Sequence, residues 1–433
     1  MKKIYGWIFC CILVFVLALV LGFHLFPKGI SKTKSQTPSS AAKKERLVVH
    51  EWGTFTSIAG NDGIAIEWRP LSAPSDLPKF VYSVERSDSN EGLRHSPTRN
   101  EAVATSGKST RATIRMETPV IYFYTDAEMD VSVKVDFPKG RVTEWYPQAR
   151  SINKQTDKII ETNHAIVAGG EVDWGKFKLM PSAGANFLKE KVNSHYYPAR
   201  ETDAVPLRVC GKDKSDTEYE KFLFYRGIGT FDLPLTVRLD ETNAKQIFLA
   251  NRGAEAIKNL IVFENRGGHI GFKTLSELND VEAAIERPVL NQSLDDVLAE
   301  LKSLLIAQGL YEKEARAMIE TWRDSWFEEG LRVFYVLPRK TTDEILPLQI
   351  EPKPQEVVRA LVGRAEVITP EMEKEVKTKV GLLKSSSPSV RNEAMKDLQK
   401  HGRFYEPILK SILKKEADAN VRAQLEKLIA AKA

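Results

Sequence analysis

Four carboxylate residues stand directly before a tryptophan in this chain, and they are its first candidates for chemistry. Carboxylates beside aromatic rings are what sugar binding and glycoside hydrolysis require. A carbohydrate-active hydrolase would use an acid pair drawn from Glu51, Glu67, Glu117 and Glu144. The alternative is structural, because adjacent strand residues face opposite ways and each Trp can fill a core while its acid faces solvent. The four dipeptides are Glu51-Trp52, Glu67-Trp68, Glu144-Trp145 and Asp173-Trp174.

A second concentration of polar side chains lies in the segment HYYPARETDA (195–204). Its Arg200 could orient an anionic ligand through the planar guanidinium group. The segment could equally form a hydrogen-bonded corner between strands, since buried polar groups are normally paired. We assign no catalytic residue, and the candidate ligand-binding residues are His50, Trp52, Glu67, His195, Arg200 and Asp203.

Metal and cofactor signatures are missing from the sequence. The histidines are scattered without HxH, HExxH or CxxC spacing, so a metal site would need long-range assembly. No P-loop, GxSxG elbow or dinucleotide-binding motif occurs. We therefore predict no metal and no cofactor. Cys210 lies between Val209 and Gly211 in a strand-like run, which favours a small buried hydrophobe over a nucleophile.

The net charge of +5 divides unevenly along the chain. Lys and Arg counted against Asp and Glu give +7 for residues 1–46, −7 for 47–370 and +5 for 371–433. A mildly acidic body lacks the basic surface that nucleic-acid binding requires. We therefore expect no nucleic-acid partner.

The N-terminus predicts a membrane segment. Residues 4–26 are apolar apart from His24, and as a helix they would span about 34 Å, enough for a hydrocarbon core. The stretch is long for a cleaved signal peptide and lacks a small-x-small site, which favours an uncleaved signal anchor. Lys2 and Lys3 before it favour export of the body. We predict a single-pass membrane protein with a transmembrane helix at 1–26, a flexible tether at 27–46 and a periplasmic or otherwise extracytoplasmic body.

The region 47–280 is predicted to be β-rich, because short alternating strands are separated by Gly, Pro and Asn turns. The first two strands, 47–58 and 64–69, are expected to form a hairpin around Asn61-Asp62-Gly63. We expect its core face to hold Val49, Glu51, Phe55, Ile64, Ile66 and Trp68. The opposite, polar face would hold His50, Trp52, Thr54, Thr56, Glu67 and Arg69, with Gly53 as the natural place for a bulge.

Later segments complete this body. Residues 83–113 are polar and predict a long loop. A helical hairpin is predicted in 281–330, with one helix capped by Ser293 and ended by Gly309, and a second from about 312 to 327. A β segment at 331–370 would complete the body. The fold class is mainly β, with sandwich-like antiparallel sheets, a helical hairpin insertion and a C-terminal helical tail.

The tail, 371–433, contains an internal repeat. Ser389-Val390-Arg391 recurs as Asn420-Val421-Arg422, and Ser387-Pro388 is a good helix start. The pattern VRxxAxxxLxxxGxxxxPxLxxxL at 390–413 resembles a HEAT-like repeat, and the resemblance implies a protein-binding or packing module. An ordinary helical cap is the alternative. A tail with so few repeats is not stable on its own, and we therefore expect it to pack against the β body.

Much of 49–370 resembles an uncharacterised bacterial family of exported or membrane-anchored proteins with an H-E-W-G-T-F-T-S motif. The resemblance implies export and no chemistry. It rests on VHEWGTFTSIAGNDG (49–63), RMETPVIYFY (115–124), TEWYPQA (143–149), YYPARETDA (196–204), EKFLFYRGIGTF (220–231) and TWRDSWFEEGLRVFYVLPR (321–339).

Two functions remain open from sequence. The first is a membrane-tethered extracytoplasmic binding or scaffold protein of unknown ligand, with a possible protein partner for the tail. The second is the hydrolase. Two carboxyl groups roughly 5–10 Å apart in an open, aromatic-lined cleft would support the hydrolase. Acids that are dispersed or held by arginines would exclude it.

Overall fold

The computed structural model describes residues 46–68, 77–84, 97–99, 112–153, 169–191, 194–210, 217–240, 242–279, 282–400 and 403–431. The predicted membrane helix and, apart from Arg46, the predicted tether lie outside these residues. Within the described ranges, no helix is both long and apolar enough to cross a membrane.

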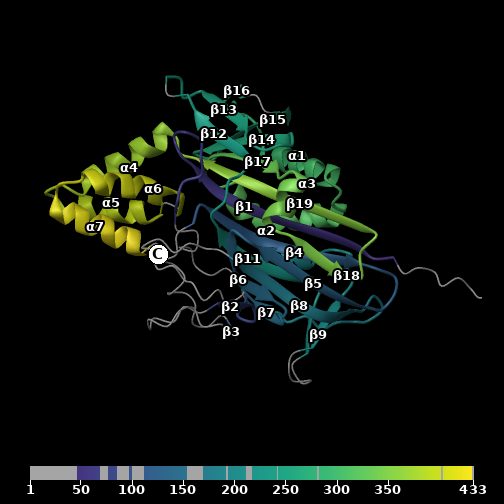
Figure 1. Cartoon of the computed structure of the whole chain (residues 1–433). Helices are drawn as coiled ribbons and strands as arrows, with labels where there is room; N and C mark the ends of the chain where they lie inside the picture. The colour runs from purple at the N-terminus through teal and green to yellow at the C-terminus, as the bar shows by residue number, and fades with distance from the viewer. Residues whose placement is uncertain are drawn as a thin grey trace, which may run out of the picture. The chain divides into compact units, whose positions relative to one another are not determined.

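Strands dominate the fold, with 41% strand against 28% helix, so the prediction of a mainly β protein is confirmed. The strands form three sheets (Figure 1). The largest has ten strands in the order β15-β14-β17-β19-β1-β4-β11-β6-β2-β3. The second follows the path β10-β9-β8-β5-β18, with β7 paired to β8, and the third has the order β12-β13-β16.

The ten strands of the large sheet come from distant parts of the chain. They are β1 (Val48–Ala59), β2 (Tyr82–Val84), β3 (Pro97–Arg99), β4 (Ile114–Tyr124), β6 (Gly140–Tyr146), β11 (Phe222–Gly229), β14 (Ile257–Arg266), β15 (His269–Leu278), β17 (Gly330–Val336) and β19 (Glu356–Val367). The smaller sheets contain β5 (Met129–Phe137), β7 (Ser151–Ile152), β8 (Gly170–Leu179), β9 (Leu207–Cys210), β10 (Thr217–Glu220), β12 (Leu235–Leu239), β13 (Gln246–Asn251), β16 (Ala283–Glu286) and β18 (Leu348–Glu351).

Two of these sheets face each other, as the sandwich prediction required. Phe177 of β8 packs edge-on against Phe123 of β4, with ring centroids 5.5 Å apart, and Trp174 packs against Tyr225 of β11 at 6.1 Å. The large sheet is mixed rather than antiparallel, because β1 and β19 run parallel over their full length. The predicted all-antiparallel arrangement is therefore wrong at the centre of the sheet.

Strand β1 is buried on both faces, which corrects the prediction of one polar face. Every residue from Val48 to Ala59 is buried. One face lies under helix α2 (Glu312–Trp326), whose Glu314 binds His50. On the other face Glu51 accepts from Tyr225 of β11, whose ring packs against Trp174 of the second sheet. The alternation of polar and apolar residues along β1 therefore does not mark a solvent-facing side.

The predicted hairpin between residues 47–58 and 64–69 does not form. The turn itself forms, since the amide of Gly60 donates to the carbonyl of Ile64 at 2.8 Å and Gly63 has φ +83°. Beyond it only an isolated Ala59–Ala65 bridge remains, and Trp68 bridges to Ala112 instead. Both edges of β1 are already occupied by the longer strands β4 and β19.

The hairpin error also misplaces the side chains that follow the turn. Ile64 is 57% exposed rather than in the core, and Glu67 is exposed. Arg69 and most of the predicted loop 83–113 lie outside the described residues, although 97–99 form β3.

The bulge expected at Gly53 is confirmed. The register of β1 against β4 shifts between Trp52 and Thr54. A Cβ atom on Gly53 would lie 2.8 Å from the Cα of Pro119, so only glycine allows this close approach. On the facing strand, Thr118 has φ +50°.

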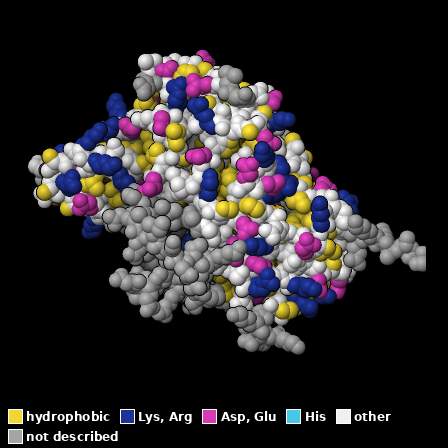
Figure 2. Space-filling model, in the orientation of Figure 1, with side chains coloured by type: hydrophobic (Ala, Val, Ile, Leu, Met, Phe, Trp, Pro, Cys, Tyr) yellow, Lys and Arg dark blue, Asp and Glu magenta, His cyan; other side chains and the backbone are white. Residues whose placement is uncertain are grey.

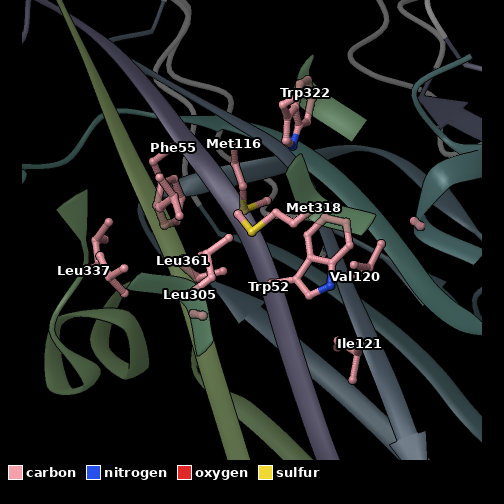
Figure 3. Packing of buried hydrophobic residues seen from close by; sticks show 14 of the residues in the cluster. Trp52, Phe55, Met116, Val120, Ile121, Leu305, Met318, Trp322, Leu337 and Leu361 are labelled. Carbon is pink, nitrogen blue, oxygen red and sulfur yellow. The ribbon is translucent and has the colours of Figure 1, made fainter. Parts of the chain in front are cut away.

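The helical hairpin forms as predicted. Helix α1 (Leu294–Ala307) starts at Ser293, whose hydroxyl accepts from the amide of Asp296 at 3.2 Å, and Gly309 follows it with φ +99°. Figure 3 shows Leu305 of α1 and Met318 of α2 in the same buried cluster as Trp52 of β1. Both helices therefore cover the large sheet rather than standing apart from it.

The remaining helices follow the strands. One helix was not anticipated, α3 (Arg339–Ile345), which interrupts the β segment predicted at 331–370 before β18. The tail contains α4 (Pro370–Leu382), α5 (Pro388–Lys400), α6 (Glu406–Lys415) and α7 (Ala419–Ala431) around a core of its own.

The repeated arginines of the tail play matching roles. Arg391 at the start of α5 donates to the carbonyl of Ser385 at 2.6 Å. Arg422 at the start of α7 donates to the carbonyl of Leu413 at 2.8 Å. Each arginine thus binds carbonyl groups at the end of the preceding helix, which gives the sequence repeat a physical cause.

The tail packs against the β body, as expected from its small number of repeats. Phe404, between α5 and α6, packs on Trp68 with centroids 5.6 Å apart, and the Arg364 guanidinium lies 4.9 Å from the same ring. Glu371 of α4 accepts from Arg287 at 3.1 Å. These contacts fix the helical module to the large sheet.

Candidate functional site

The tryptophans of the acid–Trp dipeptides fill the core. Their exposed fractions are 0% for Trp52, 0% for Trp68, 3% for Trp145 and 2% for Trp174. The structural explanation is therefore confirmed for the tryptophans, but Glu51 is buried rather than facing solvent.

The acids themselves are mostly engaged. Glu51 accepts from Arg359 and Tyr225, both at 2.5 Å, and Glu117 pairs with Arg115 at 2.7 Å. Glu144 accepts from the Thr143 hydroxyl, and Glu67 lies on the exposed turn after β1. Because arginines hold Glu51 and Glu117, these two carboxylates are not available as an acid and a base, and only Glu67 and Glu144 remain of the four candidates.

His50 makes the most unusual contact of the predicted site residues. Its Nδ1 lies 2.7 Å from Oε2 of Glu314, and the two residues are 1% and 0% exposed. Glu314 also accepts from the Tyr124 hydroxyl at 2.8 Å and from the amide of Tyr311 at 2.7 Å. Glu314 can do so because it is the third residue of α2, where its carboxylate meets the free amides of the helix start.

Two tyrosines enclose the His50 ring. The Tyr311 ring lies 4.5 Å from it and is 44% exposed, and the Tyr124 ring lies 5.3 Å away. Burial, and then Glu314, raises the pKa of Tyr124, so this hydroxyl remains a donor. The Glu314 carboxylate thus holds the His50 imidazole through Nδ1. The imidazole Nε2 has no hydrogen bond to a described residue, and the Tyr311 ring packs against the imidazole.

A cavity of about 330 Å³ is lined in part by Val358, the register partner of His50. It forms where the β17–β19 ladder ends at Val336–Val362 while β19 continues toward Glu356. The residues that line it are Glu255, Ala256, Lys258, Gln308, Val336, Leu337, Pro338, Arg339, Val357, Val358 and Arg359.

One of the lining residues, Arg359, carries a buried cation that is closed off from the cavity. Its side chain is fully buried; Nε binds Glu51, and Nη1 donates at 2.7 Å to both Asp343 and the carbonyl of Leu346. Burial disfavours the charged guanidinium, but Glu51 and the other acceptors outweigh it and raise the pKa of Arg359. Nη2 alone has no hydrogen-bond partner in the part of the chain that the structure describes.

The segment HYYPARETDA forms the corner that sequence allowed as its alternative. Arg200 donates from Nη2 to Glu220 at 2.6 Å and from Nη1 to the carbonyl of Leu188 at 2.7 Å. Four aromatic rings surround its guanidinium at 5.3–5.8 Å: Phe80, Phe187, Tyr196 and Tyr197. Its charge and donors are thus satisfied within the fold.

Three predicted site residues contact helix α2, two of them near its start and one near its end. His50 binds Glu314, His195 lies 2.8 Å from Asp324, and Asp203 pairs with Lys313 at 2.5 Å. Of the other three, Arg200 forms the corner, Trp52 lies in the core and Glu67 lies on the turn.

Neither Glu314 nor Arg359 is among the site residues predicted from the sequence. Arg359 carries a signal that could have been used, a charge inside the apolar run VVRALVGRAEV (357–367) of a strand buried along most of its length.

Two sequence expectations concern a metal site and the burial of Cys210. Among the described residues, no group of three His, Cys, Asp or Glu side chains is placed to hold a metal ion. Cys210 is exposed rather than buried. In β9 the side chains of Leu207 and Val209 are buried, and the alternate positions, Arg208 and Cys210, are more exposed.

Comparison with known proteins adds little. No family model and no curated protein matches the chain. Among solved structures it is similar to the yeast delta-COP-I mu-homology domain, with TM-score 0.30 and 9% identity over 75% of this chain and 98% of that one. The Fcho1 mu homology domain of Danio rerio with bound Eps15 peptide gives TM-score 0.26 and 7% identity over 75% and 97%. Similarities this weak support no conclusion about fold or function.

Proposed function

We propose that the chain is a binding or scaffold protein, tethered to a membrane by residues 1–26 with its body outside the cytoplasm, and that its helical tail binds an acidic protein partner. The observation that carries the second part is the charge pattern of α4–α7. Figure 2 shows Lys and Arg side chains gathered over these helices.

Acidic side chains of the tail are largely neutralised from within. Lys377 pairs with Glu373 at 2.7 Å, Lys379 with Glu375 at 2.7 Å, and Lys384 with Glu416 at 2.9 Å. A further set of exposed lysines makes no ion pair with any described residue. This set, the free lysines, consists of Lys374, Lys396, Lys414, Lys415 and Lys427.

The free lysines belong to a helical module that packs against the β body. Phe404, packed on Trp68 and under Arg364, holds the module to the sheet. A fixed array of uncompensated positive charge favours a partner of complementary charge, and such complementarity mainly sets association rate and specificity. The HEAT-like resemblance of the tail implies a protein-binding or packing module, and says nothing about the charge of a partner.

Reversing three free lysines tests this proposal. The variant Lys374→Glu/Lys396→Glu/Lys414→Glu should lower the yield of cross-linked acidic partners of the full-length protein at least about tenfold, because attraction becomes repulsion. Quantitative mass spectrometry of the co-purified proteins gives the readout. Deleting 371–433 is a poorer test, since it uncovers Trp68 and Arg364.

A matched variant on the body controls for net charge. Lys245→Glu/Lys340→Glu/Lys353→Glu makes the same change at exposed lysines of the body and should retain the partners. Equal recovery by the two triple variants would contradict the proposal, and so would partners that carry no excess of Asp and Glu.

Membrane topology needs a separate test. Alkaline phosphatase fused after residue 46 should be active in cells, because this enzyme matures only outside the cytoplasm, and the activity should disappear when residues 1–26 are removed. An inactive full-length fusion would place the body in the cytoplasm.

A further inference from the structure

We propose that the edge strand β15 pairs with β15 of a second copy of this chain, so that the ten-stranded sheets of two molecules join. The proposal goes beyond the binding or scaffold function and depends neither on the tail partner nor on the membrane tether. It rests on three features of β15, which are a free edge, self-complementary backbone groups and opposite charges at matching positions.

Strand β15 forms one margin of the large sheet (Figure 1). It runs from His269 to Leu278 and pairs on its inner side with β14 in one continuous register. Thr274, Ser276 and Glu277 are exposed, so the second half of the strand is accessible. A long edge strand of this kind is a template for pairing with another chain.

The backbone groups of alternate residues in an antiparallel strand point to opposite edges. In β15 the even-numbered residues point outward. The carbonyl of Ile270 accepts from the amide of Gln292 at 2.9 Å, and the amide of Phe272 donates to the Gln292 side chain at 2.6 Å. The carbonyl of Leu278 accepts from the Asn251 side chain at 3.3 Å. These contacts occupy the two ends of the outer edge and leave its middle open.

The remaining outward groups are complementary to a second copy of themselves. Among the described residues, nothing bonds to the amide and carbonyl of Thr274 and Ser276, the carbonyl of Phe272 or the amide of Leu278. In an antiparallel pair centred on Leu275, Thr274 lies opposite Ser276 of the second copy, and the two residues exchange both hydrogen bonds. The carbonyl of Phe272 then faces the free amide of Leu278 in the second copy. The two-fold axis repeats each of these bonds.

The same alignment matches the side chains. Lys273 lies opposite Glu277 of the second copy, and Leu275 lies opposite Leu275. Opposite charges that face each other across two strands stabilise the pair. An alignment centred on Lys273 or on Glu277 would instead place like charges together. The charges therefore favour the alignment that the backbone groups favour.

Lys273 is available for this contact. Its ion pair within the chain is with Glu286 at 3.6 Å, and the Glu286 side chain is 84% exposed. An ion pair this exposed contributes little to stability, so Lys273 can exchange it for Glu277 of the second copy.

Replacing Ser276 with Pro tests the backbone pairing. Proline is tolerated on an edge strand where its nitrogen faces outward, so the change removes a hydrogen bond of the dimer and none within the chain. Sedimentation of the detergent-solubilised full-length protein should show a dimer for the wild type and for Ser276→Ala. Association of Ser276→Pro should be at least about tenfold weaker. Its circular dichroism spectrum should match that of Ser276→Ala, which shows that the fold is retained.

Charge exchange tests the alignment. Lys273→Glu should weaken association about tenfold, because like charges then face each other in both halves of the pair. Lys273→Glu/Glu277→Lys should restore association, since the two charges only change places. Lys353→Glu, at an exposed lysine of the β18–β19 turn, makes the same change in net charge and should leave the dimer intact.

Three results would overturn the proposal. A full-length protein that stays monomeric at every concentration would exclude a second copy as the occupant of this edge. Equal association of Ser276→Pro and Ser276→Ala would show that the dimer forms through another part of the chain. Association that Lys273→Glu/Glu277→Lys does not recover would exclude the alignment centred on Leu275.

Discussion

Replacing Glu51 with Gln should lower the free energy of unfolding by about 3–5 kcal/mol, because it leaves the buried Arg359 cation without its main counter-ion. Glu51 and the Arg359 side chain are both 0% exposed, and the Arg359 Nε to Glu51 Oε2 distance is 2.5 Å. The Tyr225 hydroxyl, which donates to the other carboxylate oxygen, loses a charged acceptor in the same change.

Urea unfolding followed by tryptophan fluorescence measures this loss. Glu356→Gln serves as the control, since its ion pair with Arg46 is 3.5 Å long and half exposed. That control should change the free energy of unfolding by less than about 1 kcal/mol. The double variant Glu51→Leu/Arg359→Met should recover part of the loss, because no unpaired charge remains. A Glu51→Gln effect no larger than the control would show that Asp343 alone compensates Arg359.

Glu366→Gln should have an effect of similar size, about 3–5 kcal/mol or more, because one carboxylate serves two buried arginines. Arg332 approaches its Oε1 at 2.8 Å and Arg364 at 2.5 Å, and both arginine side chains are 0% exposed. Burial lowers the pKa of Arg332, and Glu366 opposes that effect. Without Glu366, two guanidinium groups remain side by side in the interior.

The Glu366 change should also loosen the tail. Arg364 lies against the Phe404 ring, so a displaced guanidinium disturbs the contact between module and sheet. Hydrogen exchange should accelerate in 403–409 as well as in β19. Glu328→Gln is the matched control, since Glu328 binds the same Arg364 but is 41% exposed. Equal stability of the two variants would mean that Glu366 has no special role, and unchanged exchange in 403–409 would separate the tail from this network.

The contacts of the H-E-W-G motif in β1 could not be predicted from the sequence, because its partners lie far away in the chain. His50 is held by Glu314, Glu51 by Arg359, and Gly53 by the close approach of Pro119. Each partner lies on a different element, so the motif connects β1 to α2, β19 and β4. His50 and Trp52 were predicted on a polar face of β1, whereas the structure buries both faces of this strand.

Local features were predictable because they depend on neighbouring residues. The strand at 129–137 alternates cleanly and is found within those bounds as β5. The Ser293 cap and Gly309 bracket α1, and Gly53 marks the bulge. Caps, turns and periodicity act over a few residues, so their signals are complete in the sequence.

What the sequence determined by itself was the mainly β class, the helical hairpin, the repeat in the tail and the identity of the residues able to carry charge. The tertiary structure decided which of these charges are buried and what they meet. Glu51 and Arg359 lie 308 positions apart in the chain, yet they share one contact in the fold. A carboxylate acts as an acid, a ligand or a structural ion according to its burial and the charges around it, and those depend on strand pairing across the whole chain.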